Sequence, residues 1–298
     1  MSNLTCTKIV HKKKKNIGLN ILYYTSGIIL SLLFLFPIIY MLATSTKTEA
    51  QWALDAGTLR MFLPSLNFNQ IIDNYSVVFI KFDVWKYFIN SLVYAAISIV
   101  LNILINGLAG YAIAKFTFPG KRFFNFIIIF LIVVPVETSI IPLLSIVRSV
   151  LGLKGSLSIL AVILPASISI FNIFLFVQFF KGIPTEYEEA ARMDGASNLR
   201  VFFSVIVPLS KPIIATVAVF CFIGVWNDYI WPQLVLSSNT AWPLDTIQSA
   251  LEAIQTDPNI TIGQVMASLV ITSLPIFIVY IVAQKYIVQG FGSAGLKL

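Results

Sequence analysis

The chain has 298 residues, of which 58% are hydrophobic and only 11% are charged. Soluble domains usually carry about 25% charged residues, so this composition argues against a soluble enzyme. The net charge of +7 is interpreted as membrane topology and contact with anionic lipid headgroups rather than nucleic-acid binding. Apolar runs of about twenty residues favour helices, because barrel strands alternate over about ten. We therefore predict an all-α, polytopic membrane protein.

Six transmembrane helices are predicted, at 18–44, 87–114, 123–147, 157–180, 211–236 and 264–286. They form one six-helix transmembrane domain, 18–290, between a basic cytoplasmic N-terminus, 1–17, and a cytoplasmic C-terminal tail, 291–298. Lys12 to Lys15 precede the first apolar run, which raises the alternative of a signal peptide. That run is about twice as long as a cleavable one, so an uncleaved first span is predicted.

Positive charge sets the predicted orientation. With the N-terminus in the cytoplasm, fourteen of the 20 lysines and arginines fall on the cytoplasmic side and six on the outer side, in the direction of the positive-inside rule. Arg148 and Lys154, in a short outer loop, run against the rule. We expect both termini on the cytoplasmic side of a prokaryotic cell membrane.

The outer segment 45–86 is long enough to hold structure of its own, and a short surface helix is expected in it. The two cysteines are Cys6, expected in the cytoplasm, and Cys221, expected within a span, so no disulfide is predicted. His11 is the single histidine of the chain, and no His/Cys metal cluster is predicted.

Ionisable residues at bilayer depth are candidates for a substrate path, because they are costly to place there. Glu137 follows Pro135 in the third predicted span, which indicates a broken helix that lines a cavity. Alternatively, Glu137 only holds the broken helix together or reaches the outer interface. Asn90, Asn102 and Asn106 are polar residues of the second span; such residues more often join helices than touch a ligand, and Asn90 is retained as a path candidate.

Trp226, Asn227 and Asp228 stand near the outer end of the fifth predicted span. An aromatic ring beside an amide and a carboxylate suits a sugar, whose hydroxyls need hydrogen bonds while its CH face stacks. The alternative, which the position favours, is that Trp226, Tyr229 and Trp231 form an interfacial aromatic belt. The sequence leaves both interpretations open.

A charged island at 181–211 interrupts the apolar sequence, and its local chemistry predicts a helix, a turn and a second helix. Thr185 and Glu188 fit a capping box at the start of the first helix. Gly195 supplies a stop, because glycine adopts left-handed backbone geometry cheaply. Ser197 can then cap the second helix.

The second helix of the island carries Leu199, Phe202, Phe203 and Ile206 at i, i+3, i+4 and i+7. This spacing predicts one apolar stripe that packs back on the membrane bundle. Pro208 marks the return of the chain toward the fifth span.

The first helix of the island has a different character. Ala190 and Ala191 present almost no side chain, so the groove of another protein can approach the backbone closely. Glu189 and Arg192 offer charges that would orient such a partner. The paired helices and the glycine turn favour a docking element over an ordinary amphipathic surface helix, which is the alternative.

The island resembles a known motif. Glu189-Ala190-Ala191, Gly195 and the ending Val205-Ile206-Val207-Pro208 are similar to the EAA motif of ABC importer permeases, with valine where leucine usually precedes the proline. In that family the segment is the coupling helix, which inserts into a cleft of the ATP-binding subunit. The resemblance implies an ATPase-coupling role for Glu189, Ala190, Ala191, Arg192, Asp194, Gly195 and Pro208.

Further short motifs resemble those of carbohydrate importer permeases, and in particular the second permease of maltose-type systems. They are Asn90-Ser91-Leu92, Gly110-Tyr111-Ala112, Phe118-Pro119-Gly120-Lys121, Trp226-Asn227-Asp228 and the stretch from Gln284 to Gly290. The resemblance implies a non-catalytic subunit that forms a carbohydrate path with a second permease. It also implies separate ATPase subunits that bind ATP and Mg, no cofactor on this chain, and an extracytoplasmic sugar-binding protein. A homodimer remains an alternative to the heterodimer.

Two other functions are weighed against this one. A self-contained secondary transporter or channel would need intramembrane ion ligands, and only Glu137 and Asp228 offer carboxylates there; clear inverted repeats are also not evident. A membrane enzyme would need a constellation of catalytic side chains that the sequence does not offer. The chain has no Gly-x-x-x-x-Gly-Lys-Ser/Thr phosphate loop, so it is not expected to hydrolyse ATP itself.

Overall fold

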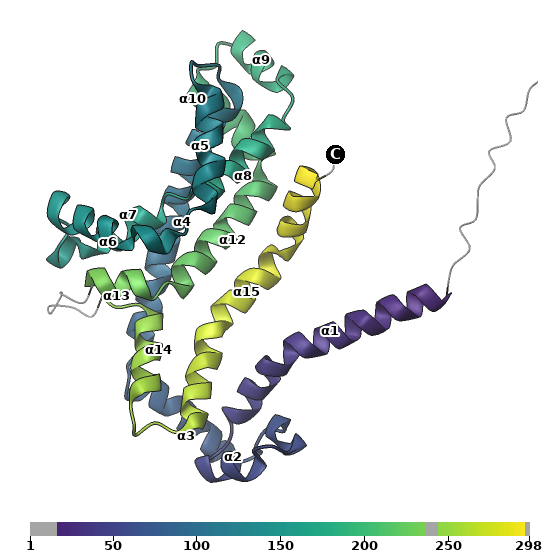
Figure 1. Cartoon of the computed structure of the whole chain (residues 1–298), viewed down its shortest axis with the longest axis vertical. Helices are drawn as coiled ribbons and strands as arrows, with labels where there is room; N and C mark the ends of the chain where they lie inside the picture. The colour runs from purple at the N-terminus through teal and green to yellow at the C-terminus, as the bar shows by residue number, and fades with distance from the viewer. Residues whose placement is uncertain (1–16, 237–243, 296–298) are drawn as a thin grey trace, which may run out of the picture.

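The computed structural model describes residues 17–236 and 244–295, which form helices and connecting turns without a strand in these two ranges (Figure 1). The elements are α1 (Ile17–Thr44), α2 (Glu49–Asp55), η1 (Leu59–Phe62), α3 (Phe68–Ile80), α4 (Val84–Lys115), α5 (Lys121–Val133), η2 (Val136–Ser139), α6 (Ile140–Ser145), η3 (Ile146–Val150), η4 (Gly155–Leu157), α7 (Ser158–Ala166), α8 (Ile170–Lys181), α9 (Glu186–Met193), α10 (Asn198–Val201), η5 (Phe202–Ile206), α11 (Val207–Leu209), α12 (Lys211–Asn227), α13 (Ile230–Leu236), α14 (Ile247–Thr256) and α15 (Ile262–Gly295). The basic N-terminus with Cys6 and His11, and the last three residues of the predicted tail, lie outside the described residues.

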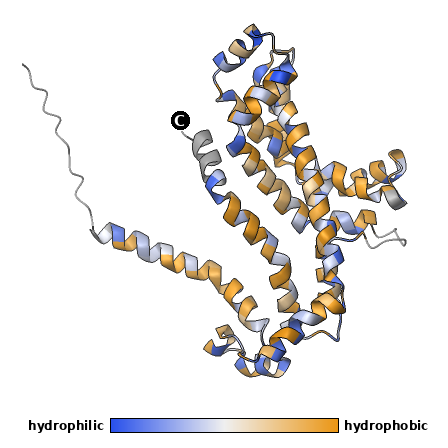
Figure 2. Cartoon of the chain, turned by 180° about the vertical axis from the view of Figure 1, so that it is seen from behind, coloured by the Kyte–Doolittle hydropathy of each residue, from blue (hydrophilic) through white to orange (hydrophobic). Residues whose placement is uncertain are grey.

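Four segments of the described chain are long and apolar enough to cross a bilayer: Asn20–Thr44, Val84–Lys115, Ser158–Lys181 and Ile262–Tyr286. They confirm the first, second, fourth and sixth predicted spans. Two bent helix pairs raise the number of spans to six if each pair is counted as one. Hydrophilic residues gather at the α9 end and at the α2–α3 end, whereas the helices between them are mainly hydrophobic (Figure 2). This pattern is the one expected of a bundle that crosses a membrane.

The third predicted span, 123–147, is not one straight helix. α5 ends at Val133, and 136–150 continues at 98° to it. The residue before a proline is driven out of the helical region, and Val134 is extended accordingly, with ψ at 121°. The sequence therefore predicted the break at Pro135 correctly. With 13 residues, α5 is about 20 Å long, which is shorter than the hydrocarbon core.

The fifth predicted span, 211–236, was wrong as a continuous helix. α12 ends at Asn227, Asp228 is extended, and α13 follows as a separate short helix. The carboxylate of Asp228 accepts a hydrogen bond from the backbone N–H of Trp231 at 3.3 Å, which stabilises the start of α13. At the other end, α10, η5 and α11 meet α12 at 85°.

The segment between α1 and α4 confirms the predicted surface helix and adds more order than expected, since it holds α2, η1 and α3. Lys47 is only 3% exposed and forms a salt bridge with Asp55 at 2.9 Å. The side-chain amide of Asn74 donates to the carbonyls of Ser45 and Lys47 at 2.9 and 3.0 Å. A Cβ on Gly263 would lie 2.5 Å from the Lys47 carbonyl oxygen. We call Lys47, Asp55, Asn74 and Gly263 the outer brace, because they join the ends of α1, α3 and α15 on the side that the sequence predicts to face outward.

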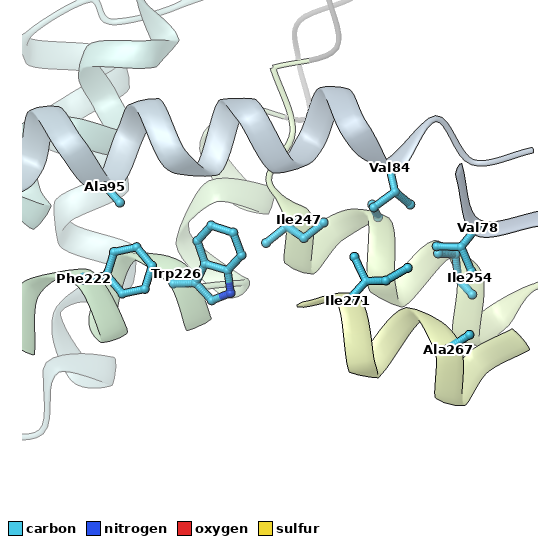
Figure 3. Packing of buried hydrophobic residues seen from close by; sticks show 10 residues of the cluster. Val78, Val84, Ala95, Phe222, Trp226, Ile247, Ile254, Ala267 and Ile271 are labelled. Atoms are coloured by element: carbon cyan, nitrogen blue, oxygen red, sulfur yellow. The ribbon is translucent and has the colours of Figure 1, made fainter. Parts of the chain in front are cut away.

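The interior of the bundle consists of packed aromatic and branched side chains. Figure 3 shows one cluster, in which Trp226 of α12 stacks on Phe222 at a ring-centroid distance of 5.5 Å, near Ile247 of α14 and Ile271 of α15. By contrast, α1 extends away from the bundle (Figure 1). Its apolar side chains are largely exposed. The apolar surface of an exposed helix of this length is covered by lipid or by another membrane helix.

Candidate functional site

α9 stands at the end of the molecule opposite α2 and α3 (Figure 1). Its C-terminus is closed by Gly195, whose φ of +77° is the left-handed value that glycine adopts without strain. The N–H of Gly195 donates to the carbonyl of Arg192 at 2.9 Å, and the N–H of Ala196 donates to that of Ala191 at 3.0 Å. This pair of bonds is a Schellman motif. The glycine stop predicted from the sequence is confirmed.

The predicted capping box at the start of α9 is wrong. Thr185 has helical dihedral angles and makes no side-chain cap; its carbonyl instead accepts from the N–H groups of Glu188 and Glu189, each at 3.0 Å. The Glu188 side chain turns into the protein and is only 5% exposed. It forms a salt bridge with Lys115 at 2.8 Å and accepts a hydrogen bond from the Tyr111 hydroxyl at 3.2 Å. The cap is lost because this buried pairing takes the carboxylate.

The outward face of α9 carries Tyr187, Ala190 and Met193, which follow at i, i+3 and i+6. Tyr187 is 53% exposed and Met193 is 88% exposed, on either side of the exposed Ala190. Ala191 is half-buried and packs against the core. The face is thus a small residue between two exposed apolar side chains, bordered by the exposed carboxylate of Glu189. Such a surface fits a complementary groove on another protein.

The return segment after α9 differs in register from the sequence prediction. Ser197 caps α10 as predicted, because its hydroxyl accepts from the Arg200 N–H at 3.4 Å. The predicted apolar stripe is only half correct, since Leu199 and Phe203 are exposed by 61% and 50%. The reason is the π-helical turn η5, whose wider i→i+5 geometry buries a different set of side chains: Val201, Phe202 and Ile206. Pro208 lies exposed in α11.

A second candidate site is a partly open cavity of about 340 Å³ between α4, α8 and α12. Its lining combines amides, a hydroxyl and a carboxylate with aromatic rings: Asn102, Ala166, Ser169, Phe171, Asn172, Phe220, Cys221, Gly224, Val225 and Asp228. The chain between α7 and α8 forms one wall. This mixture of polar and aromatic groups is suited to a small polyhydroxylated ligand.

Two asparagines of α4 hold the α7–α8 connection in place. Asn102 donates to the Ala166 carbonyl at 3.2 Å and accepts from the Asn172 amide at 2.9 Å. Asn106 donates to the Ser167 carbonyl and accepts from the Ser169 N–H, both at 3.2 Å. The sequence-based expectation that these side chains join helices is confirmed. Asn102 also lines the cavity, so the same residue positions the cavity wall.

The predicted path residues fall in different places. Asp228 lines the cavity. Asn227 is exposed, and Glu137 is exposed in η2, immediately after the break at Pro135. Asn90 donates to the Asp245 carbonyl at 3.1 Å and joins α4 to the start of α14. The structure therefore brings one of the predicted path residues to the cavity lining.

Trp226 and Trp231 do not form an aromatic belt. The Trp226 ring is fully buried, and its indole N–H donates to the Thr272 carbonyl at 2.9 Å. Trp231 is 8% exposed, and its indole N–H donates to the Ala161 carbonyl at 2.9 Å. Each indole found a carbonyl partner inside the bundle, which allows the whole ring to be buried. The stacking surface of Trp226 is occupied by core side chains, so it is not presented to the cavity.

The sequence reasoning missed three groups that the structure assigns to these sites: Lys115, Glu188 and the Asn172 amide. Lys115 was counted only as a topological charge, and Glu188 only as a cap. The sequence did offer one indication that Glu188 forms an ion pair, since Glu188 and Arg192 are four residues apart on one helix face. Nothing in the sequence marks Lys115 as its partner. In the described residues, no group of three His, Cys, Asp or Glu side chains could hold a metal ion.

Comparison with known proteins places this geometry in context. The family model described as "Binding-protein-dependent transport system inner membrane component" matches residues 106–293. The arabinooligosaccharides transport system permease protein AraQ of Halalkalibacterium halodurans is 30% identical over 88% of this chain and 91% of its own length. The lactose transport system permease protein LacG of Rhizobium radiobacter is 30% identical over 91% of this chain and 94% of its own length.

The relatives also include the sn-glycerol-3-phosphate transport system permease protein UgpE of Pectobacterium atrosepticum, 37% identical over 68% of this chain and 70% of its own length. A crystal structure of a bacterial ABC transporter involved in the import of the acidic polysaccharide alginate contains a chain that superimposes with a TM-score of 0.74 and 28% identity. That match covers 92% of this chain and 98% of the other.

Proposed function

This chain belongs to the family of binding-protein-dependent transport system inner membrane components, and we propose that it forms the path for a carbohydrate in an ABC importer, together with a second permease subunit. The observation that carries the proposal is α9. It is a short, capped helix at one end of the bundle whose outward face exposes Tyr187, Ala190 and Met193. A docking face of this kind suits a soluble partner that converts ATP hydrolysis into movement of the bundle.

The partner at α9 would be an ATP-binding subunit, which carries ATP and Mg, while this chain binds neither. Glu189, Ala190 and Arg192 would contact it directly. Asp194, Gly195 and Pro208 would act by holding α9 in position, and Ala191 by packing α9 on the bundle. The proposed side is the cytoplasm, because Lys115, Lys121, Arg122, Lys181, Arg192, Arg200 and Lys211 all belong to the α9 end of the chain's helices. Both termini would then be cytoplasmic.

The opposite end would receive an extracytoplasmic sugar-binding protein. The α2, η1 and α3 segment lies there (Figure 1), and it exposes Leu54, Leu59 and Leu66 by 81%, 86% and 95%. The exposed apolar side chains of α1 that lipid does not cover would pack against the second permease. A heterodimer of related permeases is the proposed assembly.

The cargo class is proposed from two features together. The cavity beside Asp228 has room for one sugar ring, and its amides, carboxylate and aromatic rings match hydroxyls and CH faces. The arabinooligosaccharide and lactose permeases are relatives with carbohydrate names. Asp228 is the proposed contact residue in the described cavity, and Asn227 and Glu137 would act at other stages of the path, where the bundle has opened.

The experiment that tests this function is purification of the chain from its native membrane in a mild detergent, followed by mass spectrometry of the proteins that remain bound. A nucleotide-binding subunit and a second permease are expected. Recovery of only further copies of this chain with the ATPase would replace the heterodimer with a homodimer. A chain that purifies alone and moves solute without ATP would overturn the importer function in favour of a secondary transporter.

A pair of variants locates the contact. Ala190→Trp places a large side chain in the middle of the α9 face and is expected to remove the nucleotide-binding subunit from the preparation. Leu54→Trp, at an exposed position of the opposite end, should leave that subunit bound. If both variants retain it equally, α9 is not the docking element.

A further inference from the structure

The contact between α4 and α9 has an unusual composition for the surface end of a helix. The Glu188 carboxylate and the Lys115 ammonium group are both almost fully enclosed, with side-chain exposures of 7% and 6%. One carboxylate oxygen lies 2.8 Å from the Lys115 Nζ, and the other accepts from the Tyr111 hydroxyl at 3.2 Å. Lys115 also donates to the Ile183 carbonyl at 2.7 Å. We call Tyr111, Lys115, Ile183 and Glu188 the α4–α9 junction.

A buried ion pair usually adds little to the free energy of folding. Removing two charges from water costs more than most pairs recover, and a well-packed apolar pair would often serve the fold as well. The pair does fix geometry, because both groups need their partners at one distance and angle. Here it ties the end of α4, the loop after α8 and α9 to a single arrangement. The junction therefore holds α9 in one position relative to the end of α4.

Behind the junction, the connection to α4 is rigid. The Tyr111 ring lies against Phe116, Phe180 and Phe202, with ring-centroid distances of 5.3, 6.4 and 5.4 Å. Gly110 lets α4 approach α8 so closely that a Cβ on it would lie 2.5 Å from the Phe176 Cβ. α4 and α8 are therefore closely packed at this level, with little room to slide past one another.

α4 leads directly from the junction to the cavity. Lys115 is the last residue of this unbroken helix. Asn102 lies thirteen residues earlier, which corresponds to about 20 Å along the axis. Asn102 lines the cavity and holds the Ala166 carbonyl of the α7–α8 connection. A displacement of the end of α4 thus reaches the cavity wall without crossing a flexible segment.

We propose that the Glu188–Lys115 pair is the link that transmits a displacement of α9 to α4 and, through Asn102, to the cavity beside Asp228. The inference rests on the proposed docking of an ATPase at α9. It identifies the residues through which that docking would change the cavity in the membrane. Glu188 and Lys115 are positioning residues in this account. Neither needs to contact the ATPase or the cargo.

The chain carries its own reporter for this link. Cys221 lines the cavity and is 6% exposed, and Cys6 is the only other cysteine. In a Cys6→Ser background, the assembled importer is treated with N-ethylmaleimide, with and without ATP and vanadate. Mass spectrometry of the Cys221 peptide then gives the labelling rate. ATP hydrolysis by the same preparation is measured in parallel, so no cargo needs to be known.

The decisive variant is the double substitution Lys115→Ala/Glu188→Ala. Lys115→Ala alone would leave the buried Glu188 carboxylate with only the more distant Arg192 guanidinium, at 3.9 Å, and Glu188→Ala alone would leave the Lys115 ammonium group without a carboxylate. The unmodified chain is expected to change its Cys221 labelling rate when nucleotide is trapped. The double variant is expected to keep the ATPase subunit and its hydrolysis but to lose that change in labelling. The matched control is Lys121→Ala. Lys121 binds the Ala114 and Phe116 carbonyls at the same end of α4, at 3.1 and 2.9 Å, and its removal should leave the response intact.

Three results would overturn the link. They are a nucleotide response of the double variant equal to that of the unmodified chain, release of the ATPase subunit by the double variant but not by Lys121→Ala, and a Cys221 rate that does not respond to nucleotide in the unmodified importer. The second result would make the junction a docking support. Failure of the importer function itself is a different observation, since no ATPase subunit would then accompany the unmodified chain.

Discussion

The two ends of the molecule contain the same chemical arrangement in different surroundings. In the outer brace, Lys47 pairs with Asp55 at 2.9 Å and donates to the Arg60 carbonyl at 2.8 Å. In the α4–α9 junction, Lys115 pairs with Glu188 at 2.8 Å and donates to the Ile183 carbonyl at 2.7 Å. Each lysine thus forms an ion pair with one carboxylate and donates a hydrogen bond to one backbone carbonyl.

The difference lies in what surrounds each lysine. The Lys47 carbonyl accepts from the Asn74 amide and lies against the Gly263 backbone, and Glu49 accepts from the Ile262 N–H at 3.1 Å. Side-chain hydrogen bonds to backbone groups cross-link the end of α1, α2, α3 and the start of α15 there. α9 instead meets the bundle through the Glu188 carboxylate and the half-buried Ala191, and its other face is exposed. The same kind of ion pair is therefore one of several cross-links at one end, whereas at the other end it is the main polar attachment of α9 to the bundle.

The largest expected effect comes from Lys47→Ala. It leaves the Asp55 carboxylate and the Arg60 carbonyl without the ammonium group. Breaking a buried pair costs about 3–5 kcal/mol, and the lower end of that range is expected here because the Asp55 side chain is 23% exposed to water. The free energy of unfolding of the detergent-purified chain, measured by denaturant titration, should fall by that order. Lys154→Ala is the control, since Lys154 is an exposed lysine and such changes stay within about 0.5 kcal/mol. Equal losses for both variants would contradict a rigid outer end.

Gly263→Ala should destabilise the outer brace by a smaller amount. The new Cβ would lie 2.5 Å from the Lys47 carbonyl oxygen and 2.8 Å from the Asn74 amide nitrogen, and overpacking of this kind costs about 1–3 kcal/mol. Gly224→Ala is the matched change in open space, with no atom within 4 Å of its Cβ. It should be neutral or stabilising, because alanine favours helix. The same titration measures both, and similar values would refute the close contact.

Gly195→Ala sharpens the comparison at the α9 end. Alanine at the φ of +77° costs about 1–2 kcal/mol locally, which should alter the Schellman turn with little effect on global unfolding. We expect weaker retention of the nucleotide-binding subunit during purification, quantified by mass spectrometry. Gly57→Ala has the same φ of +77° and also faces open space, but it lies at the opposite end. Retention of the subunit should be unchanged in that variant, and a loss in both would argue against a specific role of the α9 turn.

The smallest expected effect concerns the Lys81–Asp257 salt bridge at 2.8 Å, on the same side as the outer brace. The hydrogen bond from Lys81 holds the pKa of the Asp257 carboxyl below its ordinary value of 3.8. Because the pKa is lower in the folded chain, the stabilisation is present above about pH 4 and is lost as the pH falls through the lowered value. The difference in unfolding midpoint between the unmodified chain and Lys81→Ala should be small at pH 7 and vanish in strong acid. A difference that grows in acid would contradict the assigned sign.

The long spans could be predicted because the length of an apolar run is a property of the sequence alone. The break at Pro135 could also be predicted, since proline acts on its own neighbour. The 98° turn after it could not, because its direction depends on the helices packed around it. The break between α12 and α13 at Asp228 could not be predicted in the same way. The Asp228 carboxylate caps α13 only once α13 has formed.

The candidate sites were predictable to the level of a segment but not of a side chain. Glu188 and Glu189 are identical neighbours in sequence, and only the position of Lys115 in space decides which one is buried. In the segment with the π-helical turn η5, Phe202 and Ile206 are buried as predicted, but Phe203 is exposed and Val201 is buried, because a wider turn changes which positions share a face. The burial of Trp226 depends on the Thr272 carbonyl of α15, a hydrogen-bond partner 46 residues away in sequence.

The most direct test of the central claim is photo-crosslinking from the outward face of α9. A benzophenone side chain introduced at Ala190 in the intact membrane should give a covalent adduct with a nucleotide-binding subunit, identified by mass spectrometry, whereas the same group at Leu54 should not. An adduct with that subunit from Leu54, or none from Ala190 while the complex remains assembled, would contradict the assignment of α9 as the coupling element.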